Sequence, residues 1–253
     1  MKKINLDWFN FLFCWLRFAK SQAMNKVILT HDRIFMSVVG PSGSGKTELI
    51  FKMLKGATFY PTFDKIYYFY KEYQSSFAKT QKELKGITFI KYTGFEITKS
   101  LKDCLLIYDD SCEEIFIDQE FVKIATSGRH RRLNVIYVKH NLFHQSKWSR
   151  TIDLNTTHII LFKSLRDIQQ IEYLGKQLNA LKLLKEAYSL ATSESYGHLV
   201  IDLDPKTSTS LRFASNIIGP APSIFYLSPS DVLKTEITNE KESRAYTKSL
   251  AQA

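Results

Sequence analysis

Short runs of apolar residues recur through the middle of the chain and alternate with longer stretches in which apolar and polar positions mix. The apolar runs are dense in Ile, Val, Tyr and Phe and are bounded by polar residues or glycine, which is typical of β-strands. They predict strands over residues 34–39, 65–70, 87–92, 104–108, 135–139 and 158–162. The longer stretches predict helices over residues 47–55, 75–84, 118–127 and 167–190.

Two of the strand runs, residues 105–107 and 135–138, are apolar at every position. Continuous apolarity indicates a strand that is covered on both faces, as in a parallel sheet wrapped by helices. Strands and helices also alternate along the chain, which a doubly wound arrangement requires. The predicted fold class is therefore α/β, with a mainly parallel sheet flanked by helices on both faces.

The pattern changes near the two ends of the chain. Two late runs, residues 198–203 and 224–227, flank a proline-bearing stretch, and they predict strands that either extend the sheet edge or form a small hairpin. Residues 231–253 are polar and charged, which favours a disordered tail. We expect one domain over residues 26–230.

Residues 1–25 form an opening segment that is rich in aromatic residues and is too short in its apolar part to span a bilayer. Three interpretations stay open. The segment is an amphipathic helix that binds a partner, a helix that contacts a membrane surface, or translated sequence upstream of a start at Met24.

The stretch between the strand at 34–39 and the helix at 47–55 matches the phosphate-binding pattern G-x-x-x-x-G-K-[ST] at every fixed position. In this pattern backbone N–H groups and the helix N-terminus hold the phosphates of a nucleotide. The lysine reaches the β- and γ-phosphates, and the hydroxyl that follows ligates Mg²⁺. The residues predicted to bind ATP are Gly40, Pro41, Ser42, Gly43, Ser44, Gly45, Lys46 and Thr47.

A second acidic signal follows the strand at 104–108, where Asp109 and Asp110 stand side by side. An apolar strand that ends in acidic residues is the expected metal-binding partner of a phosphate loop, so Asp109 is predicted to hold Mg²⁺. Asp110 is suited to orient or deprotonate an attacking water, and Glu113 and Glu114, one helical turn on, are alternative bases. The other interpretation is a turn in which Asp110 or Ser111 caps a helix.

Along the chain, the predicted strand at 65–70 separates the loop strand from the acidic strand. An inserted strand of this kind fits the class of P-loop ATPases that has an additional strand between the two. Simple nucleotide kinases tend to pair the two strands directly. The pattern favours the ATPase class.

Further polar residues follow later strands. Asn141 comes after the strand at 135–139 and is either a sensor that holds the attacking water or a turn residue. The basic run at 129–132 offers Arg129 or Arg132 as a finger toward the γ-phosphate of a neighbouring subunit, as a DNA phosphate contact, or as a solvated loop. Arg166 is a second finger candidate or a residue of a helix's first turn.

The charge of the chain narrows the class of partner. The formal net charge is +10 at pH 7, which suits an anionic partner such as DNA, RNA or a membrane surface. The 3 cysteines lack the spacing of a metal site, so we expect reduced thiols and an intracellular setting.

Taken in order, the motifs at 40–47, 105–110, 127–136, 139–143 and 158–167 resemble the viral genome-packaging ATPases of the FtsK–HerA superfamily. Within it, the chain is most similar to the poxvirus-type packaging ATPases of large DNA viruses, virophages, adintoviruses and Polinton (Maverick) elements. The resemblance covers about residues 28–205, or 28–228 at its widest. This chain has Asp109-Asp110 where many relatives carry Asp-Glu, and Asn141 where glutamine is common.

The resemblance implies a RecA-like P-loop ATPase of the ASCE class. It would assemble into a ring, a hexamer or a pentamer, and use ATP and Mg²⁺ to pump double-stranded DNA into a preformed capsid. Capsid or portal vertex proteins would then be partners, in a nucleus or a cytoplasmic virus factory or within the virion. Rival functions are a nucleotide kinase, a replication helicase of the superfamily 3 or AAA+ type, and a nucleotide-gated scaffold protein.

Overall fold

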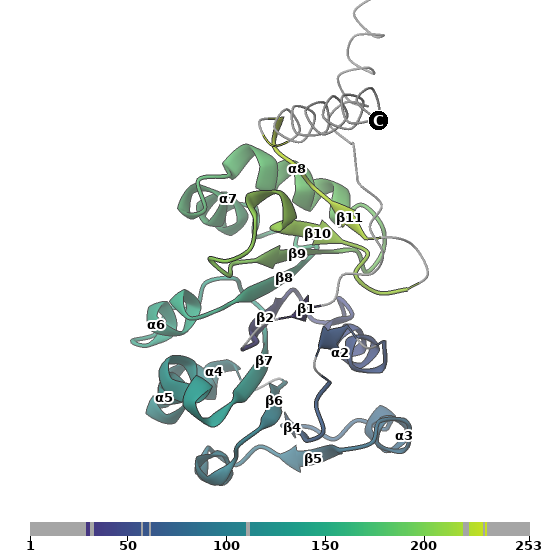
Figure 1. The fold of residues 1–253 in the computed structure, drawn as a ribbon, viewed down its shortest axis with the longest axis vertical. Helices are drawn as coiled ribbons and strands as arrows, with labels where there is room; N and C mark the ends of the chain where they lie inside the picture. The colour runs from purple at the N-terminus through teal and green to yellow at the C-terminus, as the bar shows by residue number, and fades with distance from the viewer. Residues whose placement is uncertain are drawn as a thin grey trace, which may run out of the picture.

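The protein is built around a 9-stranded sheet with the strand order β11-β10-β9-β8-β2-β7-β6-β4-β5 (Figure 1). The structure, a computed structural model, describes residues 29–30, 33–56, 58–60, 62–109, 112–219, 223–229 and 231. The strands are β2 (Phe35–Val39), β4 (Ile66–Tyr70), β5 (Ile87–Lys91), β6 (Cys104–Tyr108), β7 (Leu133–Lys139), β8 (His158–Phe162), β9 (His198–Asp202), β10 (Phe213–Ser215) and β11 (Ile224–Phe225). A separate parallel pair joins β1 (Leu29–Thr30) to β3 (Phe59–Tyr60).

The part of the sheet from β8 to β5 is parallel throughout, and β9, β10 and β11 continue it with antiparallel pairing at one edge. The two uninterrupted apolar runs, 105–107 in β6 and 135–138 in β7, are buried at every position as predicted, and every residue of β2 and β8 is buried as well. The mainly parallel α/β sheet is confirmed. The two late strands extend the sheet edge, and β10, which the sequence pattern does not reveal, lies between them.

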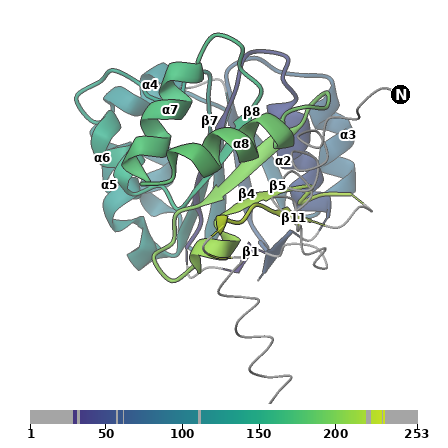
Figure 2. The ribbon, with the colours of Figure 1, turned by 90° about the horizontal axis from the view of Figure 1, so that it is seen from above.

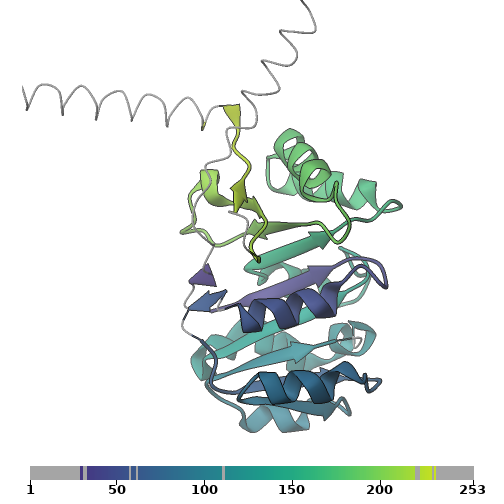
Figure 3. The ribbon, with the colours of Figure 1, turned by 90° about the vertical axis from the view of Figure 1, so that its right-hand side faces the viewer.

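Helices cover both faces of the sheet (Figure 2). One face carries α2 (Lys46–Lys55) and α3 (Ser76–Glu83), which lie in front of the strands in Figure 3. The other carries α4 (Cys112–Ile117), α5 (Gln119–Ser127), α6 (Ser149–Leu154), α7 (Ile168–Gln177) and α8 (Leu181–Ala191). Short 3₁₀ turns are η1 (Glu96–Ser100), η2 (Gly128–Arg131) and η3 (Thr209–Leu211). No helix in the described ranges is long and apolar enough to cross a membrane.

Aromatic side chains fill much of the core on the α2 face. The rings of Phe51, Tyr68, Phe77 and Phe89 lie 4.6–6.3 Å apart, centroid to centroid. Stacked and edge-on ring pairs of this kind contribute packing energy beyond their buried area. They fix β4, α2 and α3 against one another beneath the phosphate-binding loop.

Two sequence-based expectations need correction. The strand at 65–70, β4, lies on the far side of β6, and the additional strand between β2 and β6 is β7. The expected single helix at 167–190 is two helices, α7 and α8, because Leu178–Ala180 turn and Asn179 adopts a left-handed φ of 51°. Residues 1–25 and 232–253, including the N-terminal segment and most of the tail, lie outside the described residues.

Candidate active site

The loop at 40–47 joins the carboxyl end of β2 to the first turn of α2. Gly45 precedes the helix with a φ of 95°, a left-handed conformation that favours glycine. A Cβ added to Gly40 would lie 2.6 Å from Cβ of Phe162, so a side chain at that position does not fit. Because the first N–H groups of α2 have no partner within the helix, the loop and helix form a site for an anion.

Lys46 is nearly buried, with 7% of its surface exposed. Its Nζ donates hydrogen bonds of 2.8 Å to the backbone oxygens of Gly40 and Pro41, which holds the ammonium group over the loop. A cation in this position lies where the loop would receive the β- and γ-phosphates of a nucleotide.

The loop and the acidic strand meet through a direct side-chain contact. The Thr47 hydroxyl donates a 2.7 Å hydrogen bond to Oδ2 of Asp109, which directly follows β6 and is 3% exposed. The Tyr68 hydroxyl, from β4, donates to the same oxygen. Two hydroxyls from different elements thus fix the orientation of one buried carboxylate beside the loop.

The donor set at this point fits Mg²⁺. Mg²⁺ prefers oxygen ligands, and it commonly takes only one or two protein groups, with waters and substrate phosphates completing its octahedral shell. Thr47 Oγ1 and the Asp109 carboxylate supply such oxygens next to the anion-binding loop. These two residues would hold the ion.

The residues that follow Asp109 are only partly described. Asp110 lies outside the described residues, and of Glu113 only the backbone, in the first turn of α4, is described. α4 is joined to the end of β4 by an ion pair of 2.5 Å between Glu114 and Lys71. The helix that carries the alternative base therefore starts at the same edge of the sheet as Asp109.

Asn141 follows β7, the strand between the loop strand and the acidic strand. The Gly40 N–H donates a 3.1 Å hydrogen bond to the carbonyl of Lys139, so the end of β7 runs alongside the start of the loop. Asn141 is two residues further on and exposed. The order β2-β7-β6 thus brings Lys46, Asn141 and Asp109 to one edge from three adjacent strands.

Contacts with α4 and α6 hold the end of β7 and the segment that follows it. Lys139 is 3% exposed, pairs with Asp153 of α6 over 2.8 Å, and lies 5.1 Å from the ring centroid of Phe116 in α4. The Ser146 hydroxyl donates to the Phe116 carbonyl over 2.9 Å, and the His144 ring stacks on Phe116 at 4.9 Å. The candidate sensor segment is therefore packed against the helix that follows the acidic strand.

The basic run lies at the opposite edge, because it precedes β7 whereas the phosphate loop follows β2. Burial, and secondarily the charge of Arg129, lower the pKa of Arg33, which stands just before β2, to about 10. Arg131 donates to the carbonyls of Thr98 and Lys99, and Arg132 pairs with Asp103. Arg129 and Arg132 are both exposed.

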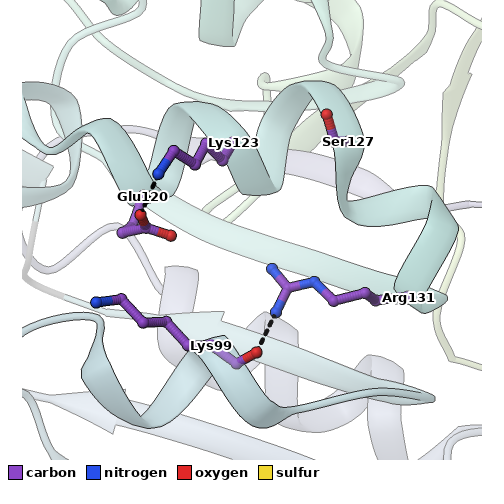
Figure 4. A pocket seen from close by; sticks show the side chains of 5 residues that line it. All are labelled: Lys99, Glu120, Lys123, Ser127 and Arg131. Carbon is purple, nitrogen blue, oxygen red and sulfur yellow. Dashed lines mark hydrogen bonds and ion pairs between the residues drawn. The ribbon is translucent and has the colours of Figure 1, made fainter.

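Arg131 also lines a surface hollow of about 320 Å³ together with Lys99, Glu120, Lys123 and Ser127 (Figure 4). The Lys123 ammonium pairs with Glu120 over 2.5 Å and the Lys99 ammonium pairs with Glu96 over 2.7 Å, so two of the three cations have a carboxylate partner. Arg131, which donates to backbone carbonyls, adds to the positive charge at this amino-terminal edge.

Arg166 lies elsewhere, at the same edge as the phosphate loop. It lines a hollow of about 630 Å³ together with residues 41–44 and 193–197. The structure therefore separates the arginine candidates: Arg166 stands beside the loop of its own chain, and Arg129 and Arg132 stand at the far edge.

Three side chains at the site carry no sequence signal. In the sequence, Tyr68 is one of several aromatic residues in a predicted strand, and Lys139 is the polar residue at the end of another. Tyr196 is one residue of a polar stretch. Each gains its place only because strands or turns distant in the sequence come together. The strand at 66–70 contains three tyrosines, so the sequence does not distinguish Tyr68 from the other two.

No protein-family model matches the chain, and no curated protein matches it. Several solved structures do match the chain. The genome packaging NTPase B204 of Sulfolobus turreted icosahedral virus 2, in complex with AMP, is 14% identical with a TM-score of 0.51, and the match covers 75% of this chain and 98% of that one. The DNA-packaging ATPase B204 of Sulfolobus turreted icosahedral virus is 14% identical with a TM-score of 0.51, covering 71% and 96%.

A likeness at this level of identity establishes the fold. The chain has the α/β fold of a P-loop NTPase of the RecA-like type, with the additional central strand of the ASCE class. The resemblance to viral packaging ATPases that the motifs indicate is confirmed at the level of the fold.

Proposed function

We propose that the chain is a Mg²⁺-dependent ATPase that drives double-stranded DNA of a virus or transposon into a preformed capsid. The observation that carries the proposal is the 2.7 Å hydrogen bond from Thr47 to Asp109, which joins the phosphate loop and the acidic strand in a single site. The shared fold with proteins described as genome packaging NTPases supports it.

In this proposal the loop N–H groups and the Lys46 ammonium bind the phosphates of ATP, and Thr47 and Asp109 hold Mg²⁺. Mg²⁺ would neutralise charge on the β- and γ-phosphates. Asn141 orients the attacking water, and Asp110 or Glu113 accepts its proton. Phosphoryl transfer needs positioning and charge stabilisation more than covalent chemistry, and these residues supply both.

The remaining transition-state charge needs an arginine, and we propose that Arg129 supplies it in trans. Arg129 stands at the amino-terminal edge of the sheet, away from the phosphate loop of its own chain. It could therefore reach only a nucleotide bound to another copy. A closed ring places the same surface of every subunit against its neighbour, so each site would receive one arginine.

The formal charge of +10 supports a DNA backbone as the polymer partner. Contacts to phosphates carry little sequence information, so we expect weak sequence preference. Capsid or portal proteins, and an intracellular or virion-associated place of action, complete the proposal. A contact with a membrane surface through residues 1–25 is a further part of it.

The strand order argues against the nucleotide kinase alternative, because β7 stands between β2 and β6. A nucleotide kinase also needs a nucleoside monophosphate as phosphoryl acceptor, whereas an ATPase transfers the phosphoryl group to water. Phosphate release from ATP with no acceptor present therefore separates the two. We expect release by the unaltered protein and none by Lys46→Ala, with Lys52→Ala, an exposed residue of α2, as the control that stays active.

The helicase alternative predicts a different action on DNA. A motor that moves along intact duplex displaces a third strand bound to that duplex without separating the two strands beneath. We expect ATP-dependent displacement of a triplex-forming strand and no unwinding of a forked duplex. Unwinding of the fork without triplex displacement would contradict the packaging motor.

A further inference from the structure

The turn at 193–197, between α8 and β9, meets the phosphate loop although some 150 residues separate them in the sequence. Together with residues 41–44 and 162–166 it encloses the hollow of about 630 Å³. That volume lies within the range of about 300–1,000 Å³ of small-molecule sites. The hollow is thus large enough for a ligand that extends beyond the phosphates.

Tyr196 is the aromatic side chain of this turn. A Cβ built on Gly45 would lie 3.0 Å from Cδ1 of Tyr196, so the ring rests directly on the loop, one residue before Lys46. The side chain is nevertheless 73% exposed. One aromatic surface therefore faces the opening beside the place where phosphates would bind.

The backbone of the turn holds this ring in place. Tyr196 has a φ of 61°, an uncommon left-handed conformation for a large residue. The Gly197 N–H donates to the Glu194 carbonyl over 3.1 Å, and a Cβ on Gly197 would lie 2.5 Å from the Ala191 carbonyl oxygen. His198 Nδ1 lies 3.3 Å from the Tyr196 carbonyl. The turn is closely packed around its exposed aromatic residue.

The other side chains of the hollow suit a ligand with flat apolar faces and polar edges. Ser193, Glu194 and Ser195 come from the turn, and Lys163 and Arg166 come from the segment after β8. A nucleobase has this character: its faces stack on aromatic rings and its edge takes hydrogen bonds.

We propose that Tyr196 is the stacking platform for the nucleobase of the nucleoside triphosphate whose phosphates bind residues 40–47. The inference rests on the proposed function, since it assigns the nucleoside half of the same ligand. Stacking on an aromatic ring is available to every base. The ring therefore contributes affinity for ATP and GTP alike.

The test compares a nucleotide with a ligand that has no base. Dissociation constants for ATP, GTP and inorganic tripolyphosphate are measured with Mg²⁺ present. Tyr196→Asn removes the ring and suits the left-handed backbone, and Tyr196→Phe keeps the ring. Tyr73→Asn, which removes another exposed tyrosine from an irregular segment, is the matched control.

We expect Tyr196→Asn to weaken ATP and GTP about tenfold and to leave tripolyphosphate unchanged, because stacking is lost and the phosphate site is kept. Tyr196→Phe and Tyr73→Asn should bind all three ligands as the unaltered protein does. Unchanged ATP affinity in Tyr196→Asn would overturn the inference. So would an equal loss for ATP and tripolyphosphate, since the ring would then only support the loop. Failure of the unaltered protein to bind any of the three ligands would overturn the proposed function itself.

Discussion

At the scale of single residues, the site depends on how a few side chains are oriented. Asp109 accepts hydrogen bonds from Thr47 and Tyr68 at one oxygen, so its other oxygen is held in a defined direction. A carboxylate fixed in this way needs no rearrangement to ligate a metal ion. Tyr68 is thus a positioning residue, fully buried among aromatic rings.

Replacing Tyr68 by Phe should raise the Mg²⁺ concentration that gives half-maximal binding of ATP by about tenfold, because a hydrogen bond to a charged group is lost. The ring remains, so the fold should be kept. Titrating Mg²⁺ against a fluorescent ATP analogue measures the change. Tyr108→Phe is the control, since Tyr108 is equally buried but packs in the cluster on the other face of the sheet. The same shift in both variants would contradict the role of Tyr68.

A second residue links stability to pH. Burial lowers the pKa of His198, which follows the Tyr196 turn, below the usual histidine value. A folded state that resists protonation loses stability as the pH falls through the unfolded value of about 6.5. When the pH is lowered from 7.5 to 5.5, the midpoint temperature of thermal unfolding should therefore decrease by more in the unaltered protein than in His198→Gln. Parallel profiles would show that His198 does not contribute.

At the scale of elements, β7 is the central strand of the account. It lies between the loop strand and the acidic strand, and Asn141 stands two residues beyond its end. Its last residue, Lys139, contacts α4 and α6. The strand therefore connects the sensor position, Asn141, with α4 and α6, which pack on one face of the sheet.

The buried ion pair of β7 and α6 should matter for stability. Asp153→Ala leaves the Lys139 ammonium buried without its partner, and such losses reach about 3–5 kcal/mol for fully buried pairs. Because Asp153 is itself 24% exposed, we expect about 2 kcal/mol, measured by urea unfolding. Glu172→Ala, which breaks the exposed pair with Lys185, should change the free energy of unfolding by less than about 1 kcal/mol. Equal effects would contradict the importance of burial.

The sequence predicts where individual strands and helices lie along the chain better than it predicts which of them lie side by side in the fold. Continuous apolar runs identify the central strands, because burial on both faces is a local property. Which strand lies beside β2 depends on crossovers, and no local pattern reports them. The break between α7 and α8 is hidden for a similar reason: apolar periodicity continues across Asn179. The close approach of Gly175 to Leu181, 2.8 Å from an added Cβ to Cα, exists only after the two helices fold back.

At the scale of the whole molecule, the two edges of the sheet differ in chemistry. The carboxyl edge holds Lys46, Thr47, Asp109 and Tyr196, and the amino-terminal edge holds the basic run at 129–132. Short motifs make the first edge predictable in part. The separation of Arg129 from Arg166 is not predictable, because it depends on which end of a strand each loop adjoins.

Mixing two inactive variants tests whether Arg129 of one subunit acts at the nucleotide site of another. Arg129→Ala and Lys46→Ala should each be inactive, and their equimolar mixture should regain about a quarter of the activity, since one contact in four would pair two intact halves. Arg166→Ala mixed with Lys46→Ala is the control, and the mixture should show no more than half the activity of Arg166→Ala alone, because Arg166 lines the hollow of its own chain. Recovery in the control alone would reverse the assignment.

The central claim is that ATP hydrolysis at the Thr47–Asp109 site drives movement along duplex DNA. The most direct measurement is the rate of ATP hydrolysis with and without linear duplex DNA, at low salt and at about 0.2 M salt. The account predicts that duplex DNA raises the rate and that the higher salt weakens this stimulation. A rate that is the same with and without DNA at both salt concentrations would contradict it.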